Sequence, residues 1–441
     1  MQLPGRLSAA IEILDDVLTH GRPAAMALSD WARSHRFAGA KDRAAIGNLV
    51  YDALRRKASL SQRMQDETAR ALVLGVLRFV WGADMDALDL LCDGSRFAPA
   101  ALVEVERRAL GAEVDPAVDA GLPAHVAGDY PAWLAPSMER VFGAEAALQG
   151  AALARRAPLD IRANTLKTTR EKLQAALARH RPEPTPLAPA GLRIAAPAAG
   201  LASANARLPH IEAESAHGKG WFEVQDEASQ LAACLAGARP GMQVADICAG
   251  GGGKTLAMAA HMENKGQIHA WDLDKHRLRP IWERLKRAGL RNVQVLESGE
   301  AEPLQPLHGR MDMVLADAPC TGSGSWRRKP DAKWRLSPEA LASRVAEQRR
   351  VLQSAAPLVR PGGQLVYVTC SLLAEENTDQ AAWFLENVPG FTVRPYEEVW
   401  RETLASPPPA SADAKEGGGL LLSPAGHGTD GFFIAVFSRV D

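Results

Sequence analysis

The chain has little cysteine, no excess of charge of either sign and no long hydrophobic run. Its 441 residues include five cysteines, an odd number without paired spacing, which argues against a disulfide framework and favours reduced thiols. The 51 basic and 52 acidic residues give a formal net charge of -1, so any nucleic-acid surface must be a local patch. No apolar run reaches the roughly 18 residues of a membrane span, and the first residues lack a signal-peptide core. We therefore expect a cytoplasmic protein, for which nothing demands more than a monomer.

The chain is long enough for about two or three domains, and its patterns change along its length. In residues 1–128, apolar residues recur at three- and four-residue spacing, which predicts a helical domain. Residues 129–220 mix helical and strand patterns, with strands expected over 159–164 and 191–194. From residue 221 to residue 441, strands and helices alternate, which predicts parallel βαβ units and a Rossmann-like α/β fold.

The expected catalytic sheet ends with a strand over residues 431–437, predicted to be its antiparallel edge. A single helix is expected over residues 275–288, and the Pro- and Gly-rich stretch 406–428 is predicted to be a mobile loop. The other expected strands of this part cover residues 243–248, 267–272, 293–296, 313–316 and 364–368.

A glycine-rich turn follows the first of these strands. Residues 246–255 read Asp-Ile-Cys-Ala-Gly-Gly-Gly-Gly-Lys-Thr, and such a turn lets backbone N–H groups approach a ligand closely. Cys248 stands where a phosphate-binding P-loop requires glycine, which argues against nucleotide hydrolysis. The next strand ends in Asp272, about 20 residues beyond the turn, where a carboxylate can accept hydrogen bonds from ribose hydroxyls. Together with Asp317 after the fourth strand, this arrangement is typical of an S-adenosylmethionine site.

Two of the cysteines follow predicted strands directly. Cys320 lies in Asp-Ala-Pro-Cys after the run 313–316, and Cys370 lies in Thr-Cys-Ser after the run 365–368. Because the carboxyl ends of strands in a doubly wound sheet line one crevice, we expect both thiols there. Such a pair suggests one thiol that attacks a substrate and one that helps to release it. Simple packing explains the other three cysteines, Cys92, Cys234 and Cys248.

These two motifs resemble those of the Nol/Nop/Sun-domain RNA (cytosine-5)-methyltransferases. The resemblance implies that Cys370 is the nucleophile, that Cys320 assists product release, and that Asp317 contacts both cofactor and cytosine. It places Lys254 beside the substrate and implies S-adenosyl-L-methionine as cofactor, with no metal. The implied cofactor-binding residues are Cys248, Ala249, Gly250, Gly251, Gly252, Gly253, Lys254, Asp272, Glu300 and Asp317. The chain departs from the family pattern where Gly250 and Gly251 replace Ala-Pro and where Glu300 replaces an aspartate.

The N-terminal part carries a looser resemblance. Lys-Asp-Arg-Ala at 41–44 and the segment 49–56 look like the NusB-like RNA-binding domain that precedes the catalytic part in one bacterial branch of this family. The resemblance implies a NusB-like domain over 1–128, a small α/β RNA-binding subdomain over 129–220 and the catalytic domain over 221–441. That branch modifies small-subunit ribosomal RNA, which is therefore the expected substrate.

Basic and aromatic residues follow Cys320 closely. Residues 326–335 hold five cations and two tryptophans, which offer phosphate contacts and flat surfaces for base stacking. The predicted RNA contacts are Arg327, Arg328, Lys333 and Trp334. In the middle region, Arg162, Asn164 and Lys167 are RNA candidates for which a structural role is an equal alternative.

Other functions stay open from the sequence. Transfer RNA is an alternative acceptor, because nothing in the basic patches identifies a sequence. A non-catalytic RNA-binding ribosome assembly factor is favoured only by the altered Gly250–Gly251 turn. A DNA cytosine methyltransferase would use Cys320 as its nucleophile and carries no counterpart of Cys370.

Overall fold

A computed structural model describes residues 1–112, 121–297, 302–411 and 418–440 of the chain. The chain forms two compact units. Unit 1 comprises Met1–Ala157, Ala196–Leu208 and Trp326–Leu336, and unit 2 comprises Pro158–Ala195, Pro209–Ser325 and Ser337–Asp441. Residues 129–157 belong to the helical unit 1. Across the described residues, no helix combines the length and the apolar character needed to span a bilayer.

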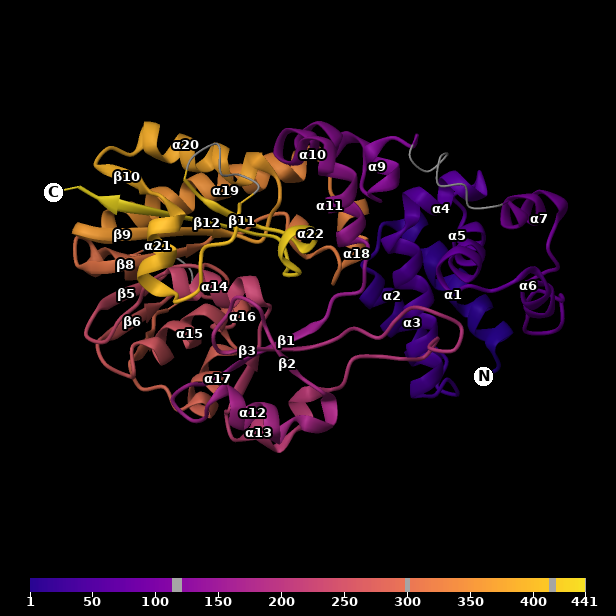
Figure 1. Cartoon of the computed structure of the whole chain (residues 1–441), viewed down its shortest axis with the longest axis horizontal. Helices are drawn as coiled ribbons and strands as arrows, with labels where there is room; N and C mark the ends of the chain where they lie inside the picture. Colours follow the sequence, from indigo (N-terminus) through magenta and orange to yellow (C-terminus); the bar gives the residue numbers. More distant parts are fainter. Residues whose placement is uncertain (113–120, 298–301, 412–417, 441) are drawn as a thin grey trace. The chain divides into compact units, whose positions relative to one another are not determined.

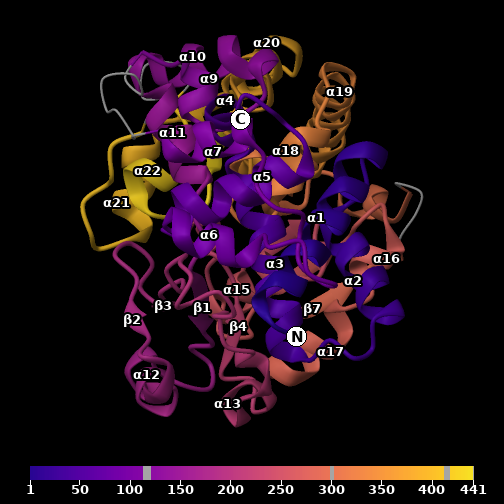
Figure 2. The same cartoon turned by 90° about the vertical axis from the view of Figure 1, so that its right-hand side faces the viewer.

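Unit 1 is helical, and its core forms where helices α1, α3 and α5 contact one another (Figure 2). The α-helices are α1 Leu3–His20, α2 Ala24–Ser34, α3 Ala40–Arg55, α4 Lys57–Met64, α5 Ala69–Gly75, α6 Met85–Leu91, α7 Glu104–Gly111, α9 Ala124–Ala127, α10 Ala135–Phe142, α11 Ala146–Leu153 and α18 Pro330–Arg335. This core buries Leu7, Ala10 and Leu14 of α1 and Ile46, Leu49 and Val50 of α3. Their three- and four-residue spacing places them on one face of each helix, as the sequence predicts.

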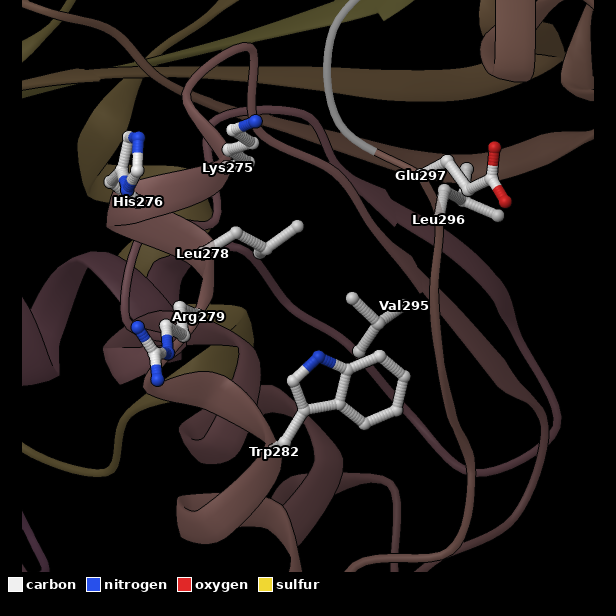
Figure 3. A pocket seen from close by; sticks show the side chains of 8 residues that line it. All are labelled: Lys275, His276, Leu278, Arg279, Trp282, Val295, Leu296 and Glu297. Atoms are coloured by element: carbon white, nitrogen blue, oxygen red, sulfur yellow. The ribbon is translucent and has the colours of Figure 1, made fainter.

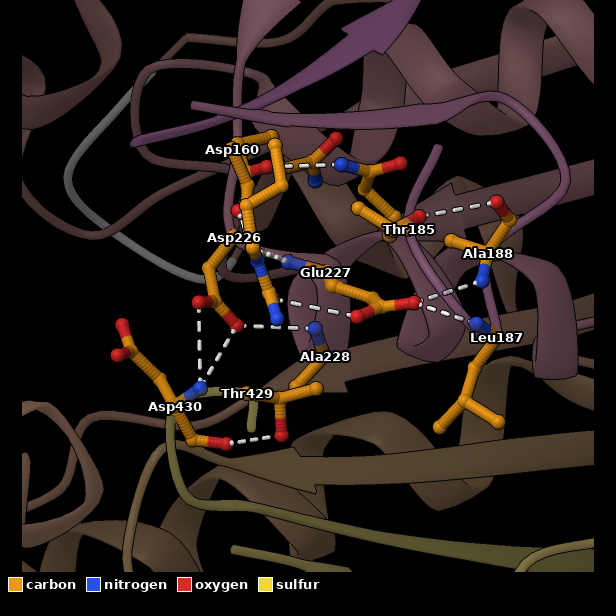
Figure 4. Close-up of polar contacts among 12 residues, drawn as sticks. Asp160, Thr185, Leu187, Ala188, Asp226, Glu227, Ala228, Thr429 and Asp430 are labelled. Atoms are coloured by element: carbon orange, nitrogen blue, oxygen red, sulfur yellow. Dashed lines mark hydrogen bonds and ion pairs between the residues drawn. The ribbon is translucent and has the colours of Figure 1, made fainter. Parts of the chain in front are cut away.

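Unit 2 contains a small antiparallel sheet in the order β2-β3-β1-β4. Its elements are β1 Leu159–Ala163, β2 Glu183–Pro184, β3 Gly191–Ile194, β4 Phe222–Val224 and the helices α12 Arg170–Ala176 and α13 Ser215–Gly218. A buried polar network fixes this sheet to helix α14 (Glu227–Leu235), as Figure 4 shows. Arg193 donates to both oxygens of Asp160 at 2.7 Å and to Glu227 at 3.2 Å, and Glu227 accepts from the backbone N–H of Ala188 at 2.9 Å.

The larger sheet of unit 2 has the strand order β10-β12-β9-β8-β5-β6-β7, with β11 paired to β12 (Figure 1). Its strands are β5 Gln243–Asp246, β6 Gln267–Ala270, β7 Val293–Val295, β8 Met311–Asp317, β9 Val359–Thr369, β10 Phe391–Arg394, β11 Leu420–Leu422 and β12 Phe432–Arg439. Strands β5 to β9 are mutually parallel, whereas β12 is antiparallel to β9 and to β10. The predicted Rossmann-like α/β fold is thereby confirmed.

Helices cover both faces of this sheet. Alternate side chains of a strand point to opposite faces. In β12, Val436 packs into the core with α14, α15 and α21, whereas the Phe437 ring contacts the tilted ring of Phe384 of α20, with centroids 4.8 Å apart. The helices are α15 Gly253–His261, α16 Lys275–Leu278, α17 Ile281–Ala288, α19 Pro338–Ala355, α20 Thr378–Asn387, α21 Tyr396–Thr403 and α22 Pro424–His427. The sheet is therefore buried on both sides, and its strand ends remain as the place for a site.

Three expectations about this part are wrong. The helix expected over 275–288 is two helices, α16 and α17, because Pro280 between them has no N–H to continue the first one. Strand β12 is not the edge of the sheet, since β10 pairs with its outer side. The stretch 406–428 is not simply a loop, because its described residues include β11 and α22.

Candidate active site

The two cysteines predicted to meet do so at the carboxyl ends of neighbouring strands. Parallel pairing of β8 with β9 places Asp317 opposite Val368, so the chain leaves both strands at the same end of the sheet. Cys320 Sγ and Cys370 Sγ lie 3.3 Å apart in a sulfur hydrogen bond. This hydrogen bond and burial raise the pKa of the Cys320 thiol well above its ordinary value. Either sulfur can be the donor of this bond, so an S–H on one cysteine is in place to stabilise negative charge on the other.

Lys254 and Asp317 form an ion pair at the same strand ends. The Lys254 Nζ donates to Asp317 Oδ2 at 2.6 Å and lies 5.1 Å from the ring centre of Phe432. Lys254 is only 7% exposed, whereas the Asp317 side chain is 31% exposed. The buried ammonium therefore fixes the orientation of a carboxylate that stays open to a ligand.

The glycine turn adopts backbone conformations that side chains disfavour. Gly250 and Gly252 have φ angles of +49° and +82°, in the region that glycine enters without steric cost. A Cβ on Gly252 would lie 2.6 Å from Ile281 Cγ1, so that α15 can begin directly against α17 only with glycine there. The turn therefore presents bare backbone at the start of a nine-residue helix, Gly253–His261.

Asp272 closes this turn from the neighbouring strand β6. Its side chain is buried, with Oδ2 accepting from the Gly250 N–H at 2.9 Å and Oδ1 accepting from the Asp274 N–H at 2.9 Å. The carboxylate is held at the end of β6 with lone pairs left for further donors. The arrangement of a backbone turn beside an oriented carboxylate suits a ribose-containing ligand, and this is the fit expected for S-adenosylmethionine.

A third carboxylate, that of Glu376, holds the Cys320 turn in place, and the sequence did not predict it. Glu376 is fully buried and accepts from the Thr321 N–H at 2.8 Å, the Thr321 hydroxyl at 2.6 Å and the Gln348 amide at 3.0 Å. Gln348 also donates to the Pro319 carbonyl at 3.0 Å, so both neighbours of Cys320 are tied to Glu376. Burial raises the pKa of Glu376. Its position in Glu-Glu-Asn matches no motif and gave no signal of this role.

A pocket of about 560 Å³ lies between α16, α17 and the end of β7. Figure 3 shows the indole of Trp282 and the side chain of Leu278 facing Val295 and Leu296, with Lys275 at the rim. Trp282 is 59% exposed, which leaves one face of its indole ring available for stacking. The lining of this pocket begins at Lys275, three residues beyond Asp272, and includes neither Cys320 nor Cys370.

Glu300, Cys248 and Ala249 were also predicted to bind the cofactor. Glu300 lies outside the described residues. Burial raises the pKa of Cys248 well above its ordinary value and that of Cys234 to about 11, in keeping with thiols that only pack. Ala249 donates its N–H to the Trp271 carbonyl at 2.9 Å, which joins the turn to the end of β6.

The structure corrects part of the predicted RNA surface. Lys333 is 1% exposed, and its Nζ donates to the carbonyls of Arg55, at 2.7 Å, and of Asp129, so it is not available for a phosphate. Arg327 is also buried, and the Trp334 indole N–H donates to Leu54. These residues fasten the segment Trp326–Leu336 within unit 1. The sequence of a loop rich in cations and aromatics is the same whether the loop faces solvent or packs against the protein, so it does not distinguish the two cases.

The middle-region candidates also have internal partners. Arg162 is buried and its Nε donates to Gln225 Oε1 at 2.7 Å, while the Asn164 amide donates to the carbonyls of Gly220 and Ala288 at 2.9 Å. The Lys167 ammonium donates to the carbonyl of Arg287 at 2.6 Å. The structural alternative therefore describes Arg162 and Asn164 better than RNA contact does.

Comparison with known proteins gives concordant matches. Residues 233–438 match the family described as 16S rRNA methyltransferase RsmB/F, and residues 130–199 match the ferredoxin-like domain of RsmF/B-like methyltransferases. The chain is 34% identical over 310 residues to a probable ribosomal RNA small subunit methyltransferase B of Synechocystis sp., with 69% of this chain and 66% of that protein covered. It is 31% identical to ribosomal RNA small subunit methyltransferase B of Vibrio cholerae, with 73% and 68% covered. The crystal structure of the protein PH0851 covers 99% of both chains at 27% identity and a TM-score of 0.73.

Proposed function

Because the chain belongs to the family of 16S rRNA methyltransferases RsmB/F, we propose that it transfers a methyl group from S-adenosylmethionine to carbon 5 of a cytosine in small-subunit ribosomal RNA. The observation that carries this proposal is the contact of two thiols, Cys320 and Cys370, at the strand ends beside the Asp317–Lys254 pair. Methyl transfer to a base nitrogen or a ribose oxygen has no use for a second thiol. The chain spans 66% of the Synechocystis relative, so the activity is proposed from this chain's own residues.

The chemistry of the base explains why two thiols are needed. Carbon 5 of cytosine is a poor nucleophile, and a thiolate that bonds to carbon 6 shifts electron density onto carbon 5. We assign this attack to Cys370, because its Thr-Cys-Ser motif after β9 resembles the nucleophile motif of the Nol/Nop/Sun-domain enzymes. Once carbon 5 carries the new methyl group, its proton passes to a base, for which solvent water suffices, the electrons of that C–H bond restore the ring double bond, and the bond from carbon 6 to sulfur breaks to return the Cys370 thiolate. Cys320 lies 3.3 Å from that sulfur and is the group placed to assist this release.

Other side chains of the strand ends position the reacting groups. The Asp317 carboxylate, oriented by Lys254, is placed to accept a hydrogen bond from the exocyclic amine of cytosine. The turn over 249–253 and the carboxylate of Asp272 would hold the methyl donor, which supplies an electrophilic methyl group when bound. A base stacked in a helix cannot reach these groups, so the target nucleotide has to be single-stranded or flipped out.

The test is a methyl-transfer assay with isotopically labelled S-adenosylmethionine and isolated small ribosomal subunits or their RNA. Nuclease digestion of the product and chromatography of the nucleosides is expected to place all label in 5-methylcytidine. Label in another nucleoside would contradict the carbon 5 assignment. Label that enters transfer RNA and not ribosomal RNA would replace the proposed substrate. Binding of S-adenosylmethionine without any transfer would favour the assembly factor.

A further inference from the structure

Unit 1 contains a pocket of about 260 Å³ that is lined by four arginines. Arg55 and Arg56 come from the end of α3, and Arg155 and Arg156 follow α11, so sequence segments about a hundred residues apart meet there. The rest of the lining comes from Asp52, Val80, Ala154 and residues 196–199. Among the described lining residues, Asp52 is the single acid, and the formal charge of the pocket is therefore +3.

Asp52 organises two of these arginines and leaves their charge undercompensated. Its buried carboxylate accepts from Arg55 Nη1 at 3.0 Å, from Arg156 Nη2 at 2.6 Å and from the Trp81 indole at 2.9 Å. Arg55 Nε and Arg156 Nη1 remain buried without a hydrogen-bond acceptor among the described residues. One carboxylate cannot satisfy two guanidinium groups that carry five N–H donors each.

The other two arginines are not held in ion pairs, although the charge of Arg56 also acts on the buried carboxylate of Asp129. Across the described part of the chain, no ion pair or side-chain hydrogen bond is formed by the guanidinium of Arg56 or of Arg155. Arg155 is exposed and Arg56 is half-buried, so both can reach a ligand at the mouth of the pocket. Two fixed arginines behind two unpaired ones make a preorganised site for a tetrahedral anion, since guanidinium groups bind phosphate in a bidentate manner.

We propose that this arginine pocket, lined by Arg55, Arg56, Arg155 and Arg156, binds a phosphate of the RNA backbone. That the phosphate belongs to RNA rests on the proposed function, whereas the anion site itself rests on the pocket alone. Backbone phosphates are present in every RNA, so the contact supplies affinity and register without reading a base. The site lies in unit 1 and uses no residue of the thiol site.

The test measures how salt weakens binding of a small-subunit ribosomal RNA fragment to the full chain. Each lost phosphate contact lowers the slope of log K against log salt by about 0.7 to 0.9. The double variant Arg56→Gln/Arg155→Gln removes two guanidinium groups without breaking a described ion pair, and loss of the one phosphate contact is expected to make its slope shallower by about 0.7 to 0.9. The matched control Arg96→Gln/Arg108→Gln removes two exposed charges of the same unit, outside the pocket, and is expected to keep the wild-type slope.

Inorganic phosphate alone is the second probe. It is expected to raise the melting temperature of the wild-type chain and of the control variant, but not of the pocket variant. Equal slopes for wild type and pocket variant would overturn the RNA contact. If phosphate nevertheless raised the melting temperature of the wild type and not of the pocket variant, the pocket would bind a free anion instead of RNA. A pocket variant with an unchanged response to both probes would overturn the site altogether. If the wild-type chain binds RNA through the pocket but transfers no methyl group, the proposed function fails and the pocket stands.

Discussion

At the scale of single residues, the contact between the two thiols couples their chemistry. Both lie at strand ends, both are partly buried, and their sulfurs share one hydrogen bond at 3.3 Å. A thiolate attacks and a thiol does not, so the proposed attack by Cys370 requires the loss of its proton. The two residues are thus a pair in which one thiol prepares the other, and neither can be replaced without changing the chemistry of its neighbour.

Asp272 should govern cofactor affinity. The variant Asp272→Ala loses the carboxylate that holds the Gly250 N–H and is expected to bind S-adenosylmethionine at least tenfold more weakly, a loss of about 1.4 kcal/mol. Titration calorimetry measures this directly. Glu398→Ala, which removes an exposed carboxylate of α21, should bind normally. An unchanged affinity in Asp272→Ala would remove this residue from the site.

Glu376 should act on product release through the Cys320 turn. Glu376→Gln places an amide N–H₂ against the donors of Thr321 and is expected to lower the free energy of unfolding by about 1–3 kcal/mol. If Glu376 has only a structural role, this loss of stability is the only effect of the substitution. A positioning role predicts in addition that a covalent RNA adduct accumulates at temperatures where the variant is folded, and that the exposed control Glu386→Gln shows none. A folded Glu376→Gln enzyme without adduct would limit Glu376 to stability.

At the scale of elements, regular alternation was predictable and local interruptions were not. The strands β1 and β3 match the expected strands to within a residue, because alternating apolar residues identify a half-buried strand directly. The positions of β10 and β12 in the sheet depend on pairing between distant segments, which no local pattern encodes. The same holds for Glu376, whose three donors come from two other segments. Sequence motifs predicted the two thiols and the glycine turn, because each of these features lies within one contiguous stretch of sequence.

The glycine turn offers a prediction at this scale. Gly252→Ala places a methyl group at φ +82° and 2.6 Å from Ile281, so it should cost about 1–3 kcal/mol of stability and weaken cofactor binding. Gly309→Ala is the matched control, since Gly309 has φ +67° but no atom within 4 Å of the added carbon. Urea unfolding and calorimetry of both variants separate backbone strain from the clash. Equal affinity of the two variants for S-adenosylmethionine would show that the tight glycine turn does not contribute to cofactor binding.

At the scale of the whole molecule, a segment that lies in sequence between two parts of unit 2 belongs to unit 1. Residues 326–336 leave unit 2 directly after the Cys320 turn and belong to unit 1, where Lys333 donates to two backbone carbonyls and Trp334 to a third. Sequence proximity to Cys320 favours an RNA surface, because burial of two cations, Arg327 and Lys333, is not the usual outcome for such a loop. The pairing of Lys333 with carbonyls from α3 and from Asp129 is a tertiary feature.

Lys333 should make stability depend on pH. Burial lowers its pKa from 10.5 to about 7, so between these values the unfolded chain holds a proton that the folded chain lacks. Stability from this site therefore rises with pH, by up to about 1.4 kcal/mol per pH unit. Lys333→Met abolishes this contribution, and the difference in free energy of unfolding between wild type and variant should grow from pH 7 to pH 9. Urea unfolding at both values measures it, and a constant difference would show that Lys333 keeps an ordinary pKa.

The measurement that tests the central claim most directly is trapping of the covalent intermediate. Cys320→Ala and Cys370→Ala are each expressed in cells, and the purified proteins are run on denaturing gels with and without ribonuclease. The two-thiol mechanism predicts a slow, ribonuclease-sensitive band for Cys320→Ala, in which attack proceeds and release fails, and no such band for Cys370→Ala. A band that appears with Cys370→Ala instead, or with neither variant, would contradict the assignment of attack to Cys370 and release to Cys320.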